Sequence, residues 1–525
     1  MDGQSWYENE KCLRSAYFIV ILVRFFWTLL PQTGYLYPDE FFQSPEIMAK
    51  HFFSINTTTT WEWNERYPVR SPVSAFLSSG APFSILKALW NIRLLKLNSY
   101  FLLVFPRIYM TVLSLLSVDI PVYILAKKLN LQPFSNLFVL STSYVTQVLG
   151  TRPFSNVLET GILGILLVIL IAPIKQQFSA TERELMDKNT SNSPFLLAGG
   201  LTALGFFCRQ TFLVFALTPY AGYFIIQLMK QENTTKPEKT LQVIIRLVLV
   251  AFGFFSVSLV IVLVDSWYFG YLQRKSIVFT PWNFITYNTM QAHKHGHHPV
   301  FTHFLVNIPL LFGPITLLWY SKLASLLSWK KLLLQGIDNG EPDHPTDNKL
   351  DLDYKNYQLV LVLSAFVPVL LLSFIPHQEP RFIMPVLIPF ILLFSHKIVG
   401  PKHSPIFLLS WCVWNFIGCL FFGVLHQGGV VPSLIHLETI INNNVMASSV
   451  PYCHHLVFFH TYMPPTHLLA WPNEISTTGH RLYIHDLAGN SEEFLHQTIS
   501  KLKEDYCDKN QSMVRFYLIL RNFIN

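Results

Sequence analysis

The sequence predicts an all-α membrane protein whose helices cross the bilayer many times. Half of its residues (51%) are apolar and only 13% are charged, about half of the 25% charged residues typical of soluble domains. Apolar stretches of about 17 to 25 residues, the length that a spanning helix needs, recur along the chain. Both observations indicate that little of the chain's surface faces water. The sequence therefore predicts a polytopic helical membrane protein.

We expect eleven spans, separated by polar segments. The first follows Lys11 and Arg14 and is expected to be retained, because residues 31–33 do not form the small-residue cleavage site of a signal peptide. The eleven predicted spans lie at about residues 15–31, 101–126, 134–149, 157–174, 195–207, 211–229, 241–264, 303–320, 357–375, 383–396 and 404–425.

The distribution of basic residues predicts the orientation. With a cytosolic N-terminus, most loop Lys and Arg residues fall on the cytosolic side, as the positive-inside rule requires. Every motif-like segment then lies on the opposite, luminal side, so the chemistry is expected to face the lumen. The net charge is +7, but the basic residues are scattered, and no nucleic-acid partner is expected.

Four regions follow from this pattern. They are the cytosolic N-terminus with the first span (1–31), a luminal catalytic loop (32–100), a transmembrane bundle (101–425) and a luminal C-terminal module (426–525). Within the module, residues 457–462, 481–484 and 514–520 are predicted strands and 492–503 a predicted amphipathic helix. The module is therefore expected to be a small α/β unit.

The cysteines and glycosylation sequons add two expectations. Six cysteines without CxxC spacing predict neither a metal site nor a disulfide framework, while Cys453 and Cys507 either pair or remain free thiols. Four sequons occur, and the predicted orientation exposes only Asn56 and Asn510 to glycosylation. The other two, Asn189 and Asn233, would face the cytosol.

A dense cluster of ionisable residues, His377-Gln378-Glu379-Pro380-Arg381-Phe382, separates two strongly apolar runs. Charge is costly in hydrocarbon, so such a cluster at a membrane surface usually binds something polar. A polyprenyl phosphate suits this place, with its tail in lipid and its anionic head at the interface. The alternative is a charged turn between two spans.

The first luminal loop contains two further candidates. Asp39 or Glu40, just beyond the first span, suits a general base on a sugar hydroxyl, whereas the alternative for Pro38-Asp39-Glu40 is a helix start. Trp61, Glu62 and Trp63 precede Arg70. Aromatic faces and interleaved charges suit a sugar or acceptor, and the alternative is an interfacial aromatic belt.

Other polar residues carry weaker expectations. Membrane-embedded ionisable residues are expected to pair, for example Arg24 or Arg107 with Asp119, while Arg152 and Arg209 either meet a phosphate or are structural. The His-rich segment 293–298 is interpreted as a solvated loop rather than a metal site. The segment 426–429, with two glycines, forms either a turn or a ligand contact.

These motifs together resemble glycosyltransferase family 22, the endoplasmic-reticulum mannosyltransferases that use dolichyl-phosphate mannose. The resemblance covers most of the chain and is carried, in order, by residues 37–44, 60–63 with 70–71, 151–156 and 377–382. Within the family, residues 377–382, 426–429 and 460–465 resemble the branch that adds the fourth mannose to glycosylphosphatidylinositol (GPI) precursors. Gln378 stands where other branches typically have Lys.

The resemblance implies a GT-C fold with a luminal site, a dolichyl-phosphate mannose donor, a trimannosyl GPI acceptor and no cofactor. It implies an inverting α-1,2 transfer in which Asp39, or else Glu40, is the base. His377, Glu379, Arg381 and Arg209 would bind the donor, with Arg381 and His377 at its phosphate. Residues Trp61, Glu62 and Arg70 would form the acceptor side.

Two alternative functions remain at this stage. One is a relative that adds the third GPI mannose or an N-glycan mannose. The other is a lipid flippase or transporter, which usually has inverted halves and broken helices at the midplane. The concentration of acids and aromatics on one face favours an enzyme.

Overall fold

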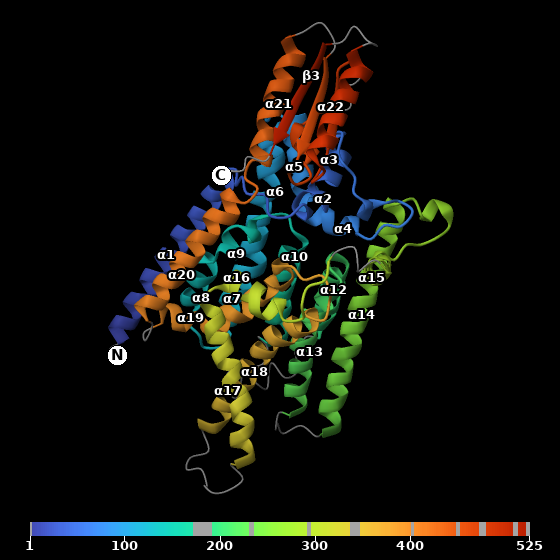
Figure 1. Cartoon of the computed structure of the whole chain (residues 1–525). Coiled ribbons are helices and arrows are strands. Elements are labelled where there is room, and N and C mark those ends of the chain that lie inside the picture. Colours follow the sequence, from blue (N-terminus) through green and yellow to red (C-terminus); the bar gives the residue numbers. More distant parts are fainter. Residues whose placement is uncertain are drawn as a thin grey trace.

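The structure is a computed structural model of the 525-residue chain, shown in Figure 1. It describes residues 3–171, 192–229, 236–290, 296–335, 347–400, 404–447, 452–471, 479–507 and 513–520. A helical bundle forms one end of the molecule, the C-terminal module forms the other end, and the short helices of the first loop lie between them.

The bundle is built from long and short α-helices together with π-helical and 3₁₀ turns that interrupt or connect them. They are α1 (Gly3–Leu29), α6 (Ser99–Ser114), η3 (Leu115–Asp119), α7 (Ile120–Lys128), α8 (Pro133–Thr142), α9 (Tyr144–Gln147), η4 (Leu149–Thr151), α10 (Ser155–Ile171), α12 (Ser193–Cys208), α13 (Phe212–Met229), α14 (Lys236–Tyr268), η6 (Leu272–Arg274), α15 (Thr280–Met290), η8 (His303–Asn307), α16 (Ile308–Phe312), α17 (Ile315–Gln335), α18 (Asp347–Leu372), η9 (Pro380–Val386), α19 (Leu387–Val399), α20 (Pro405–Leu420) and η10 (Phe421–Leu425).

The membrane prediction is confirmed. Within the described ranges, six helices are long and apolar enough to cross a membrane, or seven if the pair Tyr144–Thr151 and Ser155–Ile171, bent by 116°, counts as one span. Shorter apolar helices occur at Ser193–Cys208, His303–Phe312 and Tyr357–Leu372. Each of the eleven predicted spans overlaps one of these helices, or α8 or α17. The chain is thus a multi-pass membrane protein.

The first loop is largely helical, and several of its helices begin at residues that suit a helix N-terminus. It contains α2 (Asp39–Phe42), α3 (Pro45–Phe53), η1 (Trp61–Trp63), α4 (Pro72–Ala75), η2 (Phe76–Gly80) and α5 (Ala81–Asn91). Proline occupies the first helical position of α3 and α4, where its missing N–H costs no hydrogen bond. Ser71 caps α4 by accepting a hydrogen bond from Val73 N at 3.2 Å.

The C-terminal module has the predicted α/β character. Three parallel strands, β1 (Tyr452–Phe459), β2 (Arg481–Asp486) and β3 (Met513–Leu520), form a sheet in the order β2-β1-β3, and α22 (Glu492–Cys507) connects β2 to β3. The predicted strands and helix overlap these elements. An additional helix, α21 (Val430–Ala447), leads into the sheet and was not predicted as an element.

The first loop and the C-terminal module share one hydrophobic core, which includes Phe41, Phe83, Leu456 and Trp471. Glu46 of α3 joins them by hydrogen bonds, because its buried carboxylate accepts from the backbone N (3.0 Å) of His467, and its Oε1 lies 2.9 Å from Nδ1 of the same residue. A short helix, η11 (Thr466–Leu469), presents His467. The loop and the module therefore fold as one layer over the bundle.

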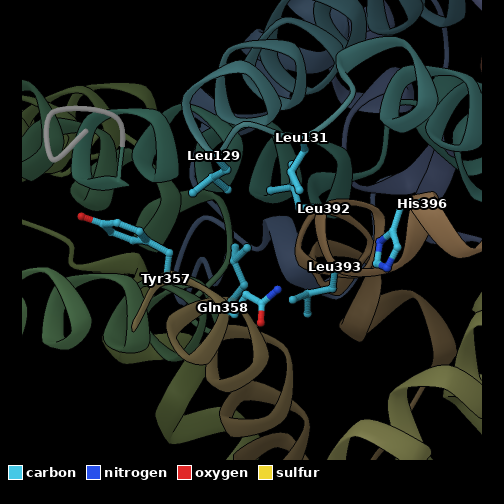
Figure 2. Close-up of a pocket in the computed structure, with 8 residues that line it drawn as sticks. Leu129, Leu131, Tyr357, Gln358, Leu392, Leu393 and His396 are labelled. Atoms are coloured by element: carbon cyan, nitrogen blue, oxygen red, sulfur yellow. The ribbon is translucent and has the colours of Figure 1, made fainter. Parts of the chain in front are cut away.

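A small cavity lies at the far end of the bundle, between the segment after α7, α18 and the end of α19 (Figure 2). Tyr357, Leu392 and His396 are among its lining residues, and its volume is about 20 Å³. Since a single water needs about 10–15 Å³, the cavity has room for solvent but not for a substrate. His396 and residue 380 lie at opposite ends of one span, so this cavity is remote from the ionisable cluster.

Candidate active site

The predicted site residues of the first loop and of segment 377–382 meet around one buried guanidinium. Arg381 Nη2 lies 2.7 Å from Asp39 Oδ2, and its Nε donates to Glu379 Oε2. His377 Nε2 lies 2.9 Å from Glu379 Oε1. The side chains of Asp39 and Glu379 are 28% and 20% exposed, while Arg381 is buried. The cluster is therefore a charged chain with an accessible side.

The environment of Arg381 leaves one donor unused. Its Nη1 atom is buried and has no hydrogen-bond partner within the part of the chain that the structure describes. Its guanidinium lies 4.5 Å from the Tyr37 ring centroid and 5.6 Å from that of Phe382, so aromatic faces hold the group in place. An anion with several acceptor oxygens would satisfy such a donor.

Electrostatics keep Glu379 ionised. Burial alone would raise the pKa of this carboxyl, but the adjacent Arg381 and His377 outweigh burial and lower the pKa to about 2. Glu379 is thus an anion at every physiological pH. Its role in this arrangement is to hold Arg381 and His377 on either side.

Asp39 is the first residue of α2, and Pro38 is the N-cap residue, so the Asp39 side chain does not cap that helix. Gln43, one helical turn later, donates from Nε2 to Asp39 Oδ2 at 2.5 Å. Among the described residues, both this bond and the Arg381 contact are made by Oδ2. The second oxygen of Asp39 is accordingly open to a ligand.

Glu40 has a different environment from its neighbour. Its side chain is 0% exposed; Oε1 accepts from Arg107 Nη2 at 2.6 Å, and Oε2 accepts from Arg152 Nη1 at 2.6 Å. Both arginines also donate to backbone carbonyls, at Gln32 and Gly34. This buried network joins the first loop to α6 and to the bend before α10. The contacts of Glu40 are therefore structural.

Arg209 follows α12 and approaches the same cluster. Its Nε lies 3.4 Å from Glu159 Oε2, and its guanidinium lies 4.9 Å from the Phe382 ring centroid. The ring of Phe382 therefore contacts both Arg209 and Arg381. Two cations predicted to meet the donor come together beside one aromatic residue.

The predicted acceptor residues form a second cluster at η1. Glu62 Oε1 pairs with Arg70 Nη2 at 2.8 Å, and Trp61 stacks on Tyr287 with ring centroids 3.9 Å apart. Burial raises the pKa of Glu62, Arg70 opposes that rise, and the negative charge of Asp39 adds to it. Glu62 is thus a buried acid whose partner is Arg70.

From the sequence, no role in the site was assigned to several residues that complete it. Gln43 and Tyr37 lie inside the motif around Asp39, so their proximity in sequence was an available signal. Tyr287 had no such signal, because it comes from the distant α15. Gln378 donates from Nε2 to Ser373 O at 2.8 Å, and its Oε1 accepts from His303 N at 3.1 Å, so it fixes the break between two spans.

The remaining expectations have mixed outcomes. Arg24 pairs with Asp119 at 3.5 Å, as expected, whereas Arg107 pairs with Glu40. Cys453 is a free thiol, and the side chain of Cys507 lies outside the described structure. Asn56 is exposed. The other three sequons, Asn189, Asn233 and Asn510, lie outside the described residues.

The metal interpretation of the His-rich segment gains no support from the ranges that the structure covers, where no group of three metal-ligating side chains occurs. Residues 293–295 lie outside these ranges. His298 Nδ1 accepts from the backbone N of Gln378 at 3.3 Å, and its ring lies 5.8 Å from that of His377. His298 therefore supports the ionisable cluster.

The turn at 426–429 brings the last span back onto the first loop. Gln427 has a left-handed φ of 49°, and a Cβ at Gly428 would lie 2.1 Å from Val424 O, so the turn requires this glycine. His426 Nδ1 lies 2.8 Å from Tyr35 O. The turn thus holds in place the segment that leads into α2.

Comparison with known proteins identifies the family. The model of the Alg9-like mannosyltransferase family matches residues 15–470. Human GPI alpha-1,2-mannosyltransferase 4 is 36% identical over 497 residues, covering 91% of this chain and 79% of its own. GPI mannosyltransferase 4 of Drosophila melanogaster is 30% identical, covering 87% and 72%.

Among solved structures, ArnT from Cupriavidus metallidurans bound to undecaprenyl phosphate superposes with a TM-score of 0.53. The identity is 11%, and the match covers 98% of this chain and 93% of ArnT. At this identity the likeness shows the fold alone, which is the GT-C fold. The chain therefore belongs to the Alg9-like mannosyltransferase family and is a multi-pass glycosyltransferase.

Proposed function

We propose that this protein is a GPI α-1,2-mannosyltransferase of the endoplasmic-reticulum membrane. It transfers the fourth mannose from dolichyl-phosphate mannose to a trimannosyl GPI precursor, on the luminal face and with inversion. Family membership and relatives named GPI mannosyltransferase 4 support this reaction. The observation that carries the site is the contact of one guanidinium, Arg381, with both Asp39 and Glu379.

In this proposal Asp39 is the general base. Its open oxygen takes the proton from the 2-hydroxyl of the acceptor mannose as that oxygen bonds to C1 of the donor mannose. The bond from C1 to the phosphate oxygen breaks at the same time, and dolichyl phosphate leaves with the electron pair. We assign this role to Asp39 rather than Glu40, because Glu40 is fully buried and both its oxygens are bound by arginines.

The donor phosphate lies, in this proposal, beside Arg381 and His377. The unused Nη1 of Arg381 donates to a phosphate oxygen and neutralises the charge that develops on the leaving group. Glu379 orients both groups, and Arg209 adds a second positive charge near Phe382. Fixed donors of this kind act without reorganising during the reaction.

The acceptor is proposed to lie beside Trp61, Glu62 and Arg70. The exposed face of Trp61 suits a sugar ring, and the Glu62–Arg70 pair offers both an acceptor and donors for hydroxyl groups. The regions 32–100 and 426–525 are proposed to form the luminal layer, and 101–425 the bundle. Residues 1–31 are proposed to contain the cytosolic N-terminus and first span.

A product assay tests the proposal. Purified protein in lipid nanodiscs is supplied with dolichyl-phosphate mannose and a trimannosyl GPI, and mass spectrometry is expected to detect a tetramannosyl product with an α-1,2 linkage. Product from a dimannosyl acceptor instead would indicate transfer of the third mannose. Folded protein that moves lipid across a vesicle but makes no product would support a flippase and overturn the proposal.

A further inference from the structure

A second pocket lies next to the acceptor residues and is not part of the site described above. It has a volume of about 590 Å³ and lies between α3, the segment after η1 and the end of α14. This volume is within the about 300–1,000 Å³ of typical ligand sites. We call it the aromatic pocket, and its key lining residues are Lys50, His51, Trp63, Glu65, Trp267 and Tyr268.

The lining suits a hydroxyl-rich ring compound. Trp267 is 67% exposed, and its neighbour Tyr268 also lines the pocket. Lys50 and His51 supply donors from one side, and Glu65 supplies an acceptor. Because charges of both signs are present, the pocket suits a largely neutral ligand with many hydroxyl groups, which describes a saccharide.

Hydrogen bonds fix the walls of the aromatic pocket. Asp265, one turn before the end of α14, accepts from Ser71 Oγ at 2.7 Å, and Tyr271 Oη donates to Arg66 O at 2.9 Å. Trp63 Nε1 donates to Phe42 O at 3.1 Å. The first two bonds join the first loop to the end of α14 and the turn after it, the parts of the chain that supply the lining of the pocket.

The aromatic pocket adjoins the acceptor cluster at η1. Within η1, Glu62 pairs with Arg70, while the next residue, Trp63, lines the pocket and donates from Nε1 to Phe42 O of α2, the helix that begins at Asp39. α14 is a membrane span that ends at Tyr268, so the pocket opens where a membrane-anchored glycolipid presents its head group. A glycan with its terminal sugar at Asp39 would extend past Glu62 into the pocket.

We infer that the aromatic pocket binds the inner saccharides of the acceptor glycan, behind the mannose that reacts. This inference rests on the proposed function for the identity of the acceptor. Trp267 and Tyr268 provide the faces on which a sugar ring packs, and Lys50, His51 and Glu65 bind its hydroxyl groups. The pocket thereby makes the enzyme select long acceptor glycans over single mannosides.

The test compares a soluble synthetic trimannoside with a methyl mannoside as acceptors for the intact protein in nanodiscs. Trp267→Ala is expected to lower the ratio of kcat/KM values, trimannoside over mannoside, by about tenfold, as the loss of a key contact residue does. Trp267→Phe, which keeps a ring, is expected to restore most of the ratio. The KM for the donor is expected to stay at the wild-type value.

Trp282→Ala is the matched control, because Trp282 is 63% exposed and does not line the pocket. If Trp267→Ala lowers kcat/KM equally for both acceptors, so that the ratio stays at the wild-type value, the inference is overturned. Calorimetry, which measures binding of the trimannoside directly, tests the pocket separately from the proposed reaction. Wild-type binding that Trp267→Ala weakens, without any product formed, would retain the pocket and refute the reaction; no wild-type binding would refute the pocket.

Discussion

Two neighbouring carboxylates illustrate how position decides the chemistry of a residue. Asp39 and Glu40 are adjacent in α2, yet the Asp39 side chain is 28% exposed and that of Glu40 is fully buried. Two arginines form ion pairs with Glu40. Removing one partner of such a buried pair leaves an uncompensated charge. Only Asp39 combines an open oxygen with contact to the ionisable cluster.

Substitution of each carboxylate by its amide separates the two roles. Asp39→Asn is expected to lower the rate of mannose transfer by about 10²–10⁴, because the base is lost. It is expected to lower the melting temperature less than Glu40→Gln does, because Arg381 loses its ion pair with Asp39 but keeps the one with Glu379. Glu40→Gln is expected to lower stability by about 3–5 kcal/mol, because Arg107 and Arg152 lose their partner. Activity and thermal unfolding of both purified variants check this, and full activity of Asp39→Asn would assign the base elsewhere.

Arg381→Lys tests the donor phosphate. A lysine keeps the positive charge but has no planar fork, so it cannot contact Asp39, Glu379 and a phosphate oxygen together. The variant is expected to bind dolichyl-phosphate mannose more weakly and to transfer mannose more slowly. Donor binding in nanodiscs measures the first effect, and wild-type affinity in this variant would contradict the proposed phosphate contact.

At the scale of elements, glycines set the closest helix packing. A Cβ at Gly199 of α12 would lie 2.0 Å from Val250 O, and one at Gly253 of α14 would lie 2.1 Å from Leu196 O. Small residues at such crossings let two backbones approach in the membrane. This contact positions α14, whose final turn anchors the first loop through Asp265.

Gly253→Leu is therefore expected to separate α12 from α14. Overpacking of this kind costs about 1–3 kcal/mol, and the clash here is with backbone, which cannot rotate away. The variant is expected to unfold at a lower temperature in a thermal-shift assay. Gly489→Leu is the control, since a Cβ at Gly489 meets nothing within 4 Å, and an equal loss of stability there would refute the packing argument.

At the scale of the whole molecule, the first loop and the C-terminal module act as one layer. They share a hydrophobic core and the buried contacts of Glu46 with His467. The proposed base lies in this layer, whereas Arg381 lies where a bundle span begins. The site thus forms only where the layer meets the bundle.

The proposed orientation places this layer in the lumen, and glycosylation checks it. Asn56 is exposed in the first loop, so protein produced in eukaryotic cells is expected to carry a glycan there. Digestion with an N-glycosidase and mass spectrometry of the peptides locate the glycan. A glycan at Asn189 or Asn233 would contradict the orientation, and Asn56→Gln serves as the negative control.

Much of the fold could be predicted because membrane helices and strands have local signals. The apolar runs predict the helices, and short segments rich in aromatic and β-branched residues near the C-terminus predict strands that overlap β1, β2 and β3. Helix α21 was missed because it contains Asn and Glu residues as well as apolar ones and follows the turn at 426–429. The short helices of the first loop also lack a signal of sufficient length.

The sequence by itself determined the class of protein, its family motifs and the side of the membrane on which those motifs are expected. Only the tertiary structure decided that Asp39 contacts Arg381, that Arg107 and Arg152 neutralise Glu40, and that Trp63 and Trp267 line one pocket. The physical reason is that hydropathy and propensity act over neighbouring residues, whereas these contacts join residues distant in sequence. Such partners are chosen by packing and by the need to pair buried charge.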